Sequence, residues 1–158
     1  MEILIPAWVD GKLQPVEKLQ THLRGLRHKA VSVFVVQGDQ TLLQCRALEK
    51  YHTPGLWANA CCTHPEWNES GLHCAVRRLG EELGIFGQTP VYRDTVEYRA
   101  DVGGGMIEHE VVEIFVVQAT EVSVQPNAHE VMDYRWEGLK NLAYQTRERP
   151  QEFTPWLK

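Results

Sequence analysis

The sequence predicts an α+β fold in which a mixed β-sheet is flanked by helices. The segment Ala30–Val36 (AVSVFVV) is almost continuously apolar and β-branched, which is typical of a buried central strand. In Ser70–Leu83, apolar residues recur at three- and four-residue steps, which indicates an amphipathic helix. Pro90–Asp101 and Met106–Ala119 have the composition of long strands. Strands therefore dominate, with one strong central helix and a weaker one from Leu139 onward.

Length and composition describe an ordinary globular protein. The chain has 158 residues, so we expect one domain spanning 1–158, and it is 43% hydrophobic and 23% charged. Its net charge of -5 disfavours general binding to nucleic acid or to a membrane surface. The four cysteines form no disulfide-rich pattern, and we see no leader peptide and no apolar run of membrane-spanning length. We therefore expect a cytoplasmic protein, either a monomer or a homodimer.

An N-terminal strand and helix extension is expected to precede the central strand. Glu2–Gln14 is predicted to form two extended segments, and Pro15 to start a short polar helix that contains Lys18 and His22. Arg24–Lys29 (RGLRHK) is predicted to be a basic connector, and it contains His28. After the central strand, Thr41–Arg46 is predicted to be a second strand.

The central helix has a clear signal at each end and a charged side. Ser70 is a suitable N-cap, and Gly84 a suitable residue to end the helix. We expect its apolar face to consist of Leu72, Ala75, Val76, Leu79 and Leu83. We expect its polar side to carry Arg77, Arg78, Glu81 and Glu82. Cys61, Cys62 and His64 precede it in a predicted loop.

The spacing around this helix resembles the Nudix box, G-x5-E-x7-R-E-U-x-E-E-x-G-U, where U is a bulky aliphatic residue. Two positions depart from it: Thr63 replaces the glycine, and Arg78 replaces a glutamate. Glutamates of that box bind Mg²⁺ on a diphosphate, because hard cations prefer carboxylate oxygens. Arg78 removes one such ligand and adds a contact for phosphate, so we expect binding of a diphosphate rather than its cleavage. The alternative is an ordinary solvated face of salt bridges.

Histidines and carboxylates elsewhere in the chain are candidate metal ligands. Glu108 and Glu110 alternate on one predicted strand and so share a face that continues as core, where a carboxylate is costly unless it is paired or bound to metal. The alternative places both at the solvated end of the strand. With His22, His28 and His64 they would form a site for Zn²⁺ or Mn²⁺, but sequence alone leaves open whether these residues meet.

Cys62 also has two interpretations. It is either a small buried hydrophobe or a nucleophile or proton donor, and local spacing does not choose between them.

Several motifs, in order along nearly the whole chain, resemble those of type I isopentenyl-diphosphate Δ-isomerases. They are Trp57–Pro65 (WANACCTHP), Tyr98-Arg99, Glu108–Val111 (EHEV), Glu130–Tyr134 (EVMDY) and Phe153–Trp156 (FTPW). The resemblance implies a Nudix-like mixed sheet sandwiched by helices. It also implies interconversion of isopentenyl diphosphate and dimethylallyl diphosphate.

The resemblance implies roles for individual residues. The residues implied to be catalytic are Cys62 and Glu110, on opposite faces of the five-carbon unit, with Tyr98 assisting Glu110. The implied ligands of a divalent ion (Mn²⁺ or Zn²⁺) are His22, His28, His64, Glu108 and Glu110. Glu82 is implied to hold the Mg²⁺ that accompanies the diphosphate. The implied substrate contacts are Lys18, Arg46, Lys50, Arg78 and Trp156.

The implied reaction is physically coherent, because protonating an alkene produces a carbocation that a dry pocket must stabilise. An indole face, from Trp57 or Trp156, supplies about 2 kcal/mol of cation–π attraction when desolvated.

Two alternatives remain. A Nudix hydrolase of a nucleoside or isoprenoid diphosphate would need the glutamate that Arg78 replaces. A non-catalytic diphosphate sensor would leave Cys62, Tyr98 and Glu110 unexplained. Cys61 offers a second thiol, but its distance from His64-Pro65 favours Cys62.

Overall fold

The computed structural model describes residues 3–50 and 53–157. Within these ranges the strands are β1 (Leu4–Val9), β2 (Lys12–Glu17), β3 (Arg27–Gln37), β4 (Gln40–Arg46), β5 (Trp57–Asn59), β6 (Cys61–Thr63), β7 (Val91–Gly103), β8 (Met106–Gln118) and β9 (Val131–Gly138). The helices are α1 (Lys18–Leu23), α2 (Gly71–Leu83) and α3 (Leu139–Glu148), with the 3₁₀ turns η1 (Pro150–Glu152) and η2 (Pro155–Leu157). None of these described helices combines the length and apolar character that a bilayer span requires.

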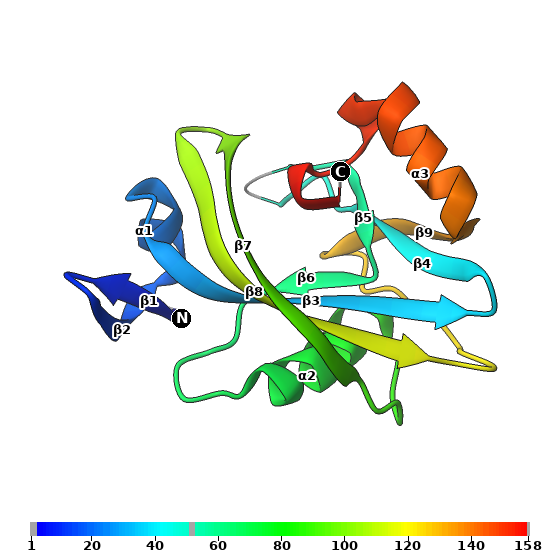
Figure 1. The fold of residues 1–158 in the computed structure, drawn as a ribbon, viewed down its shortest axis with the longest axis horizontal. Helices are drawn as coiled ribbons and strands as arrows, with labels where there is room; N and C mark the ends of the chain where they lie inside the picture. The colour runs from blue at the N-terminus through cyan, green and yellow to red at the C-terminus, as the bar shows by residue number, and fades with distance from the viewer. Residues whose placement is uncertain (1–2, 51–52, 158) are drawn as a thin grey trace.

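The described strands form one mixed sheet centred on β3 (Figure 1). The parallel neighbour of β3 is β8, and β7 continues the sheet as an antiparallel partner of β8. On the other side β3 pairs with β4 and, through its middle, with the short strand β6. The hairpin β1–β2 extends the sheet at its N-terminal end, and β9 pairs with β4. The predicted α+β class, with an N-terminal strand and helix extension, is confirmed.

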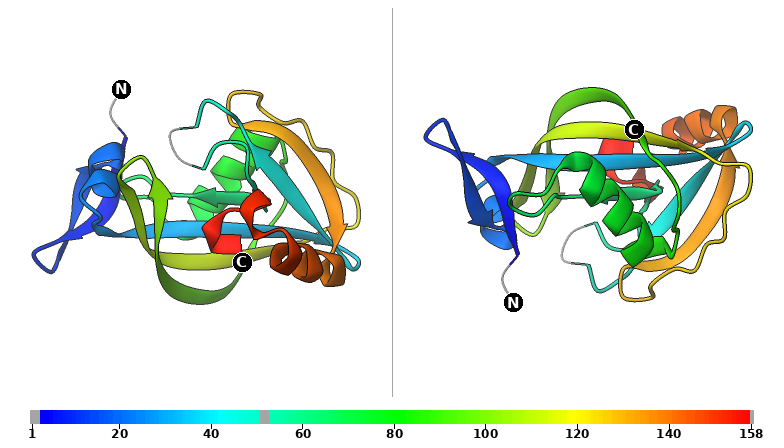
Figure 2. Two further views of the ribbon diagram at one scale, coloured as in Figure 1. Left: turned by 90° about the horizontal axis from the view of Figure 1, so that it is seen from above. Right: turned by 90° about the horizontal axis from the view of Figure 1, so that it is seen from below.

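Helices and turns cover the two faces of this sheet. In Figures 1 and 2, α2 lies against one face, whereas the C-terminal turns lie on the other. The larger core cluster lies between α2 and the sheet. It contains Val31, Val33, Val35, Leu42, Ala60, Cys61, Cys74, Ala75, Leu79, Leu83, Ile85, Phe115, Val117 and Val131. One face of β3, with Val31, Val33 and Val35, is buried in this core, whereas Ser32 and Phe34 on the other face are partly buried and line a cavity.

Several element boundaries differ from the sequence prediction. Residues 57–63 form the two short strands β5 and β6 instead of a loop, so Cys62 lies on a strand. His28 belongs to β3 rather than to a connector. Pro15 lies within β2, and α1 begins later, where the Glu17 carboxylate accepts hydrogen bonds from two backbone amides of its first turn. Short strands such as β5 and β6 are difficult to predict from sequence, because they form through tertiary pairing rather than local propensity.

The ends of α2 match the prediction, but its buried face does not. Ser70 accepts a hydrogen bond from the His73 amide at 3.1 Å, and Gly84 closes the helix with a left-handed φ of 64°. Leu72 and Val76, expected in the core, are 46% and 45% exposed. Cys74 and Glu82 are buried instead, because the helix packs along the row of Ala75, Leu79 and Leu83. Glu82, expected on the polar side, is only 2% exposed.

Candidate active site

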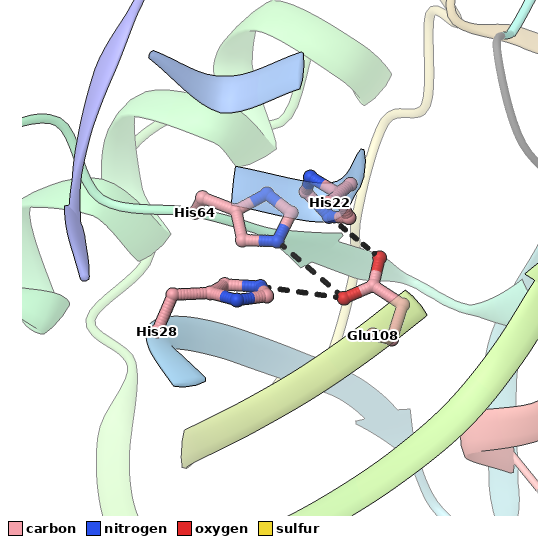
Figure 3. Close-up of side chains that lie close together, drawn as sticks. All are labelled: His22, His28, His64 and Glu108. Atoms are coloured by element: carbon pink, nitrogen blue, oxygen red, sulfur yellow. Dashed lines mark hydrogen bonds and ion pairs between the residues drawn. The ribbon is translucent and has the colours of Figure 1, made fainter. Parts of the chain in front are cut away.

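Three histidines and a glutamate from distant parts of the chain meet at one end of β3 and β8. His22 comes from α1, His28 from β3, His64 from the segment after β6, and Glu108 from β8. One ligand atom from each lies within 4.8 Å of every other. Figure 3 shows the three imidazole rings directed at the Glu108 carboxylate. Glu108 is 2% exposed and Glu110 7%, so the alternative of a solvated strand end is wrong.

Backbone contacts fix which nitrogen of two imidazoles faces the cluster. His22 Nδ1 lies 2.8 Å from the Lys18 carbonyl oxygen, and His28 Nδ1 lies 2.7 Å from the Leu26 carbonyl oxygen. A carbonyl oxygen can only accept, so both Nδ1 atoms carry the hydrogen. In its neutral form, each ring would present the lone pair of Nε2 to the Glu108 carboxylate, which also only accepts. A positive charge between such groups removes the repulsion, and this is the arrangement of histidine ligands at metal sites.

The distances fit a shared cation. His28 Nε2 lies 3.4 Å from Glu108 Oε2 and 3.5 Å from Glu110 Oε2, which is long for hydrogen bonds. Two ligands bound at about 2.1 Å to one tetrahedral ion lie about 3.4 Å apart. Burial by itself lowers the pKa of His28, but Glu108 and Glu110 outweigh burial and raise it to about 10. Burial lowers the pKa of His64, which favours its neutral, metal-coordinating form. The group has the composition and spacing to hold a divalent ion.

Strand pairing brings Glu110 beside the cluster and opposite a tyrosine. In the parallel β3–β8 pair, His28 is the register partner of Glu110, and in the antiparallel β7–β8 pair Tyr98 is. The Oε2 atom of Glu110 also lies 3.0 Å from His64 Nε2. Burial and the adjacent Glu110 raise the pKa of Tyr98, so its phenol stays protonated. Glu110 thus lies between the proposed metal ligands and a phenolic proton.

Cys62 sits on the same sheet, held by two polar neighbours. Its Sγ atom donates a hydrogen bond to Asn59 Oδ1 at 2.7 Å and lies 3.7 Å from Ser32 Oγ. The Asn59 amide has one possible orientation, because its Nδ2 donates to the carbonyl oxygen of Val33 at 2.8 Å and to that of Cys61 at 3.3 Å. Burial raises the pKa of Cys62 to about 12, so the resting group is a neutral thiol. The sulfur therefore has a fixed direction.

Two cavities of opposite character meet at these side chains. The first, about 30 Å³, is charged and is lined by Lys18, Arg46, Lys50, Cys62, Thr63, His64, Arg78, Glu82, Glu108, Glu110 and Trp156. The second, about 200 Å³, is mainly apolar and is lined by Ala30, Val31, Ser32, Phe34, Cys62, Thr63, Val96, Tyr98, Glu110, Val112, Ile114, Pro155 and Trp156. Cys62, Thr63, Glu110 and Trp156 line both. The junction suits a molecule with an anionic head and a short hydrocarbon tail.

The charged cavity is a concentrated positive site in an acidic protein. Burial and the neighbouring charges of Lys50 and Arg78 lower the pKa of Lys18 to about 8. Glu130 partly neutralises the group, because its Oε2 contacts the Lys50 ammonium and lies 3.3 Å from Arg78 Nη2. The positive charges are close enough to repel one another, which contributes to the low pKa of Lys18. Such a site is suited to an anion that carries several charges.

Of the two candidate tryptophans, only Trp156 reaches the cavities. It lies on η2, with the Arg46 guanidinium carbon 5.4 Å from its ring centroid. Trp57 instead carries the Arg135 guanidinium at 4.3 Å and packs against a small second core that includes Phe153. Trp57 is absent from the described lining of both cavities, so it is poorly placed to stabilise a charge there.

Comparisons with known proteins identify the family of this chain. A family model described as NUDIX domain matches residues 26–157. The isopentenyl-diphosphate Delta-isomerase of Dinoroseobacter shibae is 60% identical, and the match covers 100% of this chain and 90% of that protein. The protein of the same name from Jannaschia sp. is also 60% identical, over 99% of this chain and 90% of its own length. The chain belongs to the isopentenyl-diphosphate Delta-isomerase family.

Solved structures support the fold of this isomerase-family chain. A MutT NUDIX hydrolase from Burkholderia pseudomallei superposes with a TM-score of 0.64 at 21% identity, covering 83% of this chain and 92% of its own. A protein from Deinococcus radiodurans reaches a TM-score of 0.69 at 14% identity, covering 94% and 90%. At such low identity the likeness concerns the fold alone, and it confirms the predicted Nudix-like architecture.

The sequence did not indicate the roles of two polar residues that contact Cys62. Asn59 lies within the motif that contains Cys62, and its spacing from that cysteine was the only signal for it. No sequence signal linked Ser32 to Cys62, because the two residues meet only through the pairing of β3 with β6. Cys61, which sequence position disfavoured as the reactive thiol, is fully buried and faces α2 on the other side of β6.

Proposed function

We propose that the protein interconverts isopentenyl diphosphate and dimethylallyl diphosphate, the activity named for its relatives in Dinoroseobacter shibae and Jannaschia sp.. The observation that carries this proposal is the meeting of a basic cavity and an apolar cavity at Cys62, Glu110 and Trp156. The diphosphate would occupy the first and the five-carbon unit the second. The reacting carbons would then lie next to a thiol and a carboxylate.

Binding of the diphosphate would orient the substrate without taking part in the reaction. Four basic residues supply its contacts: Lys18, Arg46, Lys50 and Arg78. Glu82 lines the same cavity, and as a carboxylate it would repel the diphosphate unless a cation lay between them. We propose that this cation is Mg²⁺, which binds phosphate oxygens together with few protein carboxylates. Binding energy at this remote end can then be used to hold the carbons in place.

The reaction requires one proton to be added and another removed. A proton added to the terminal CH₂ carbon of isopentenyl diphosphate leaves a tertiary cation at C3, and loss of a proton from C2 then forms the new double bond. Cys62 and Glu110 would perform these two transfers, with Tyr98 donating a hydrogen bond to Glu110. The Trp156 face would contribute about 2 kcal/mol to the cation, and apolar walls would exclude water.

The histidine cluster would hold a second divalent ion, which we propose to be Zn²⁺ or Mn²⁺. Imidazole and carboxylate donors suit these ions. The proposed ligands are His22, His28, His64, Glu108 and Glu110. Bound there, the ion would supply positive charge beside Glu110 and fix the direction of its carboxylate. Because two backbone carbonyls already orient His22 and His28, the chain itself sets the geometry of the ligands.

The test is the exchange of substrate hydrogens in heavy water. We expect the native protein to place deuterium at C2 and C4 of the substrate pool. Cys62→Ala and Glu110→Gln are each expected to lose at least about 1,000-fold in turnover, since each removes a proton-transfer group. Near-normal turnover in either variant would contradict its assigned role. Release of phosphate from the substrate without exchange would favour the hydrolase alternative, which Arg78 argues against.

A further inference from the structure

The two adjacent cysteines of β6 face opposite sides of the sheet. Successive side chains of a strand alternate, so Cys62 faces the cavities whereas Cys61 faces α2. The Cys61 side chain is 0% exposed, and its Sγ atom lies 2.7 Å from Glu82 Oε2. A carboxylate only accepts hydrogen bonds, so the Cys61 thiol is the donor. The mechanism proposed above uses Cys62 and gives Cys61 no role.

Glu82 has two competing partners for its carboxylate. One oxygen, Oε2, is occupied by the Cys61 thiol, and the other, Oε1, lies 3.6 Å from Arg78 Nη2. A guanidinium readily binds both oxygens of a carboxylate in a forked pair. Such a pair would take Glu82 and Arg78 away from the charged cavity, which both residues line. Because the thiol holds Oε2, Oε1 is the oxygen better placed to take a partner in the cavity.

One available carboxylate oxygen suits the cation expected beside a diphosphate. Mg²⁺ keeps an octahedral shell made mostly of water and phosphate oxygens, and takes few protein ligands. Glu82 is 2% exposed, so rotation of its carboxylate would leave an oxygen buried without a partner, which is costly. The thiol therefore restricts the direction in which the Glu82 carboxylate points.

We infer that Cys61 is a positioning residue, whose thiol keeps one oxygen of Glu82 directed at the cation that accompanies the diphosphate. This inference rests on the proposed function and assigns a role to a residue outside the reacting groups. It predicts that removing the thiol weakens the binding of Mg²⁺, so that diphosphate binding requires a higher Mg²⁺ concentration. The hydroxyl of a serine, which also donates, is predicted to restore it.

The experiment uses the purified protein with its bound metal and inorganic pyrophosphate as the probe. Calorimetric binding is measured across a series of Mg²⁺ concentrations. We expect Cys61→Ala to need about tenfold more Mg²⁺ for half-maximal enhancement of pyrophosphate binding. The reason is that this variant loses a hydrogen bond to a charged group. Cys61→Ser should stay within about threefold of the native protein. The matched control is Cys74→Ala, which removes another fully buried thiol from the same core cluster but keeps the hydrogen bond from Cys61 to Glu82.

The outcomes separate this inference from the proposed function. If Glu82→Gln needs more Mg²⁺ but Cys61→Ala titrates as native, the inference is overturned and the proposed function stands. If Glu82→Gln titrates as native, the proposed Mg²⁺ role of Glu82 is wrong and the inference fails with it. Infrared difference spectra provide a second test if Cys61→Ala does not fold. The Cys61 S–H band should shift to higher frequency in Glu82→Gln, and a band that does not move would overturn the inference.

Discussion

Replacing Glu108 by glutamine tests the metal cluster most directly. The change keeps the shape of a side chain that is 2% exposed and that lies 3.0 Å from His22 Nε2 and 3.4 Å from His28 Nε2. It removes a negative charge, and its amide can donate to a histidine lone pair that the carboxylate cannot satisfy. We therefore expect Glu108→Gln to fold but to hold the ion much more weakly.

The magnitude follows from the desolvated position of the carboxylate. Changes to groups that merely support metal ligands cost about 10–100-fold in affinity, so loss of a buried charged ligand should cost at least about 100-fold. That factor corresponds to about 2.7 kcal/mol. A domain of this size shifts its Tm by about 2–4 °C per kcal/mol, so we expect a Tm about 5–10 °C lower than that of the metal-loaded native protein.

Two measurements check this prediction. Elemental analysis after dialysis should find about one ion per native chain and far less in Glu108→Gln. A strong chelator should lower the Tm of the native protein but not that of the variant. The control is Glu113→Gln, the same substitution on the same strand but on its opposite face, which should behave as native. Equal metal content in Glu108→Gln and native protein, or a native Tm insensitive to chelation, would refute the assignment of the cluster.

Three further predictions test other parts of the site and its support. Asn59→Leu removes the acceptor that directs the Cys62 thiol, so we expect steady-state kcat to fall at least about 30-fold with less than threefold change in KM; an equal change in both would contradict a positioning role. Arg78→Glu reverses a charge in the basic cavity, so calorimetry should show pyrophosphate affinity at least about 100-fold lower, and native affinity would remove Arg78 from the site. Burial alone would raise the pKa of Glu69, but contacts with Arg77, the Glu66 amide and His73 lower it to about 2 from an ordinary 4.5, a difference of up to about 3 kcal/mol. This stabilisation is present above pH 4.5 and lost as the pH falls toward 2, so the gap in unfolding free energy between native protein and Glu69→Gln should shrink over that range, and a gap independent of pH would contradict the ion pair.

The sequence by itself determined the features that depend on neighbouring residues. The start of α2 at Ser70 and its end at Gly84 were predictable, because a cap satisfies backbone groups within a few positions. The run from Ala30 to Val36 identified the central strand by its composition alone. The motifs around Cys62 and Glu110 pointed to the family, and the relatives confirm it.

Only the tertiary structure decided how those residues meet. His22, His28, His64 and Glu108 converge because β3 pairs with β8 and β6 across large sequence distances, and α1 lies beside them. The register of such pairs depends on packing over both faces of the sheet, which no local pattern encodes.

The same limit explains the errors about β6 and α2. Cys62 was expected in a loop and Glu82 on the polar side of its helix, yet pairing with β3 makes a strand of residues 61–63 and packing against the sheet buries Glu82. Adjacent cysteines look equivalent in sequence. The strand that holds them directs the Cys62 thiol at the reaction cavity and the Cys61 thiol at Glu82, because neighbouring side chains of a strand point to opposite faces.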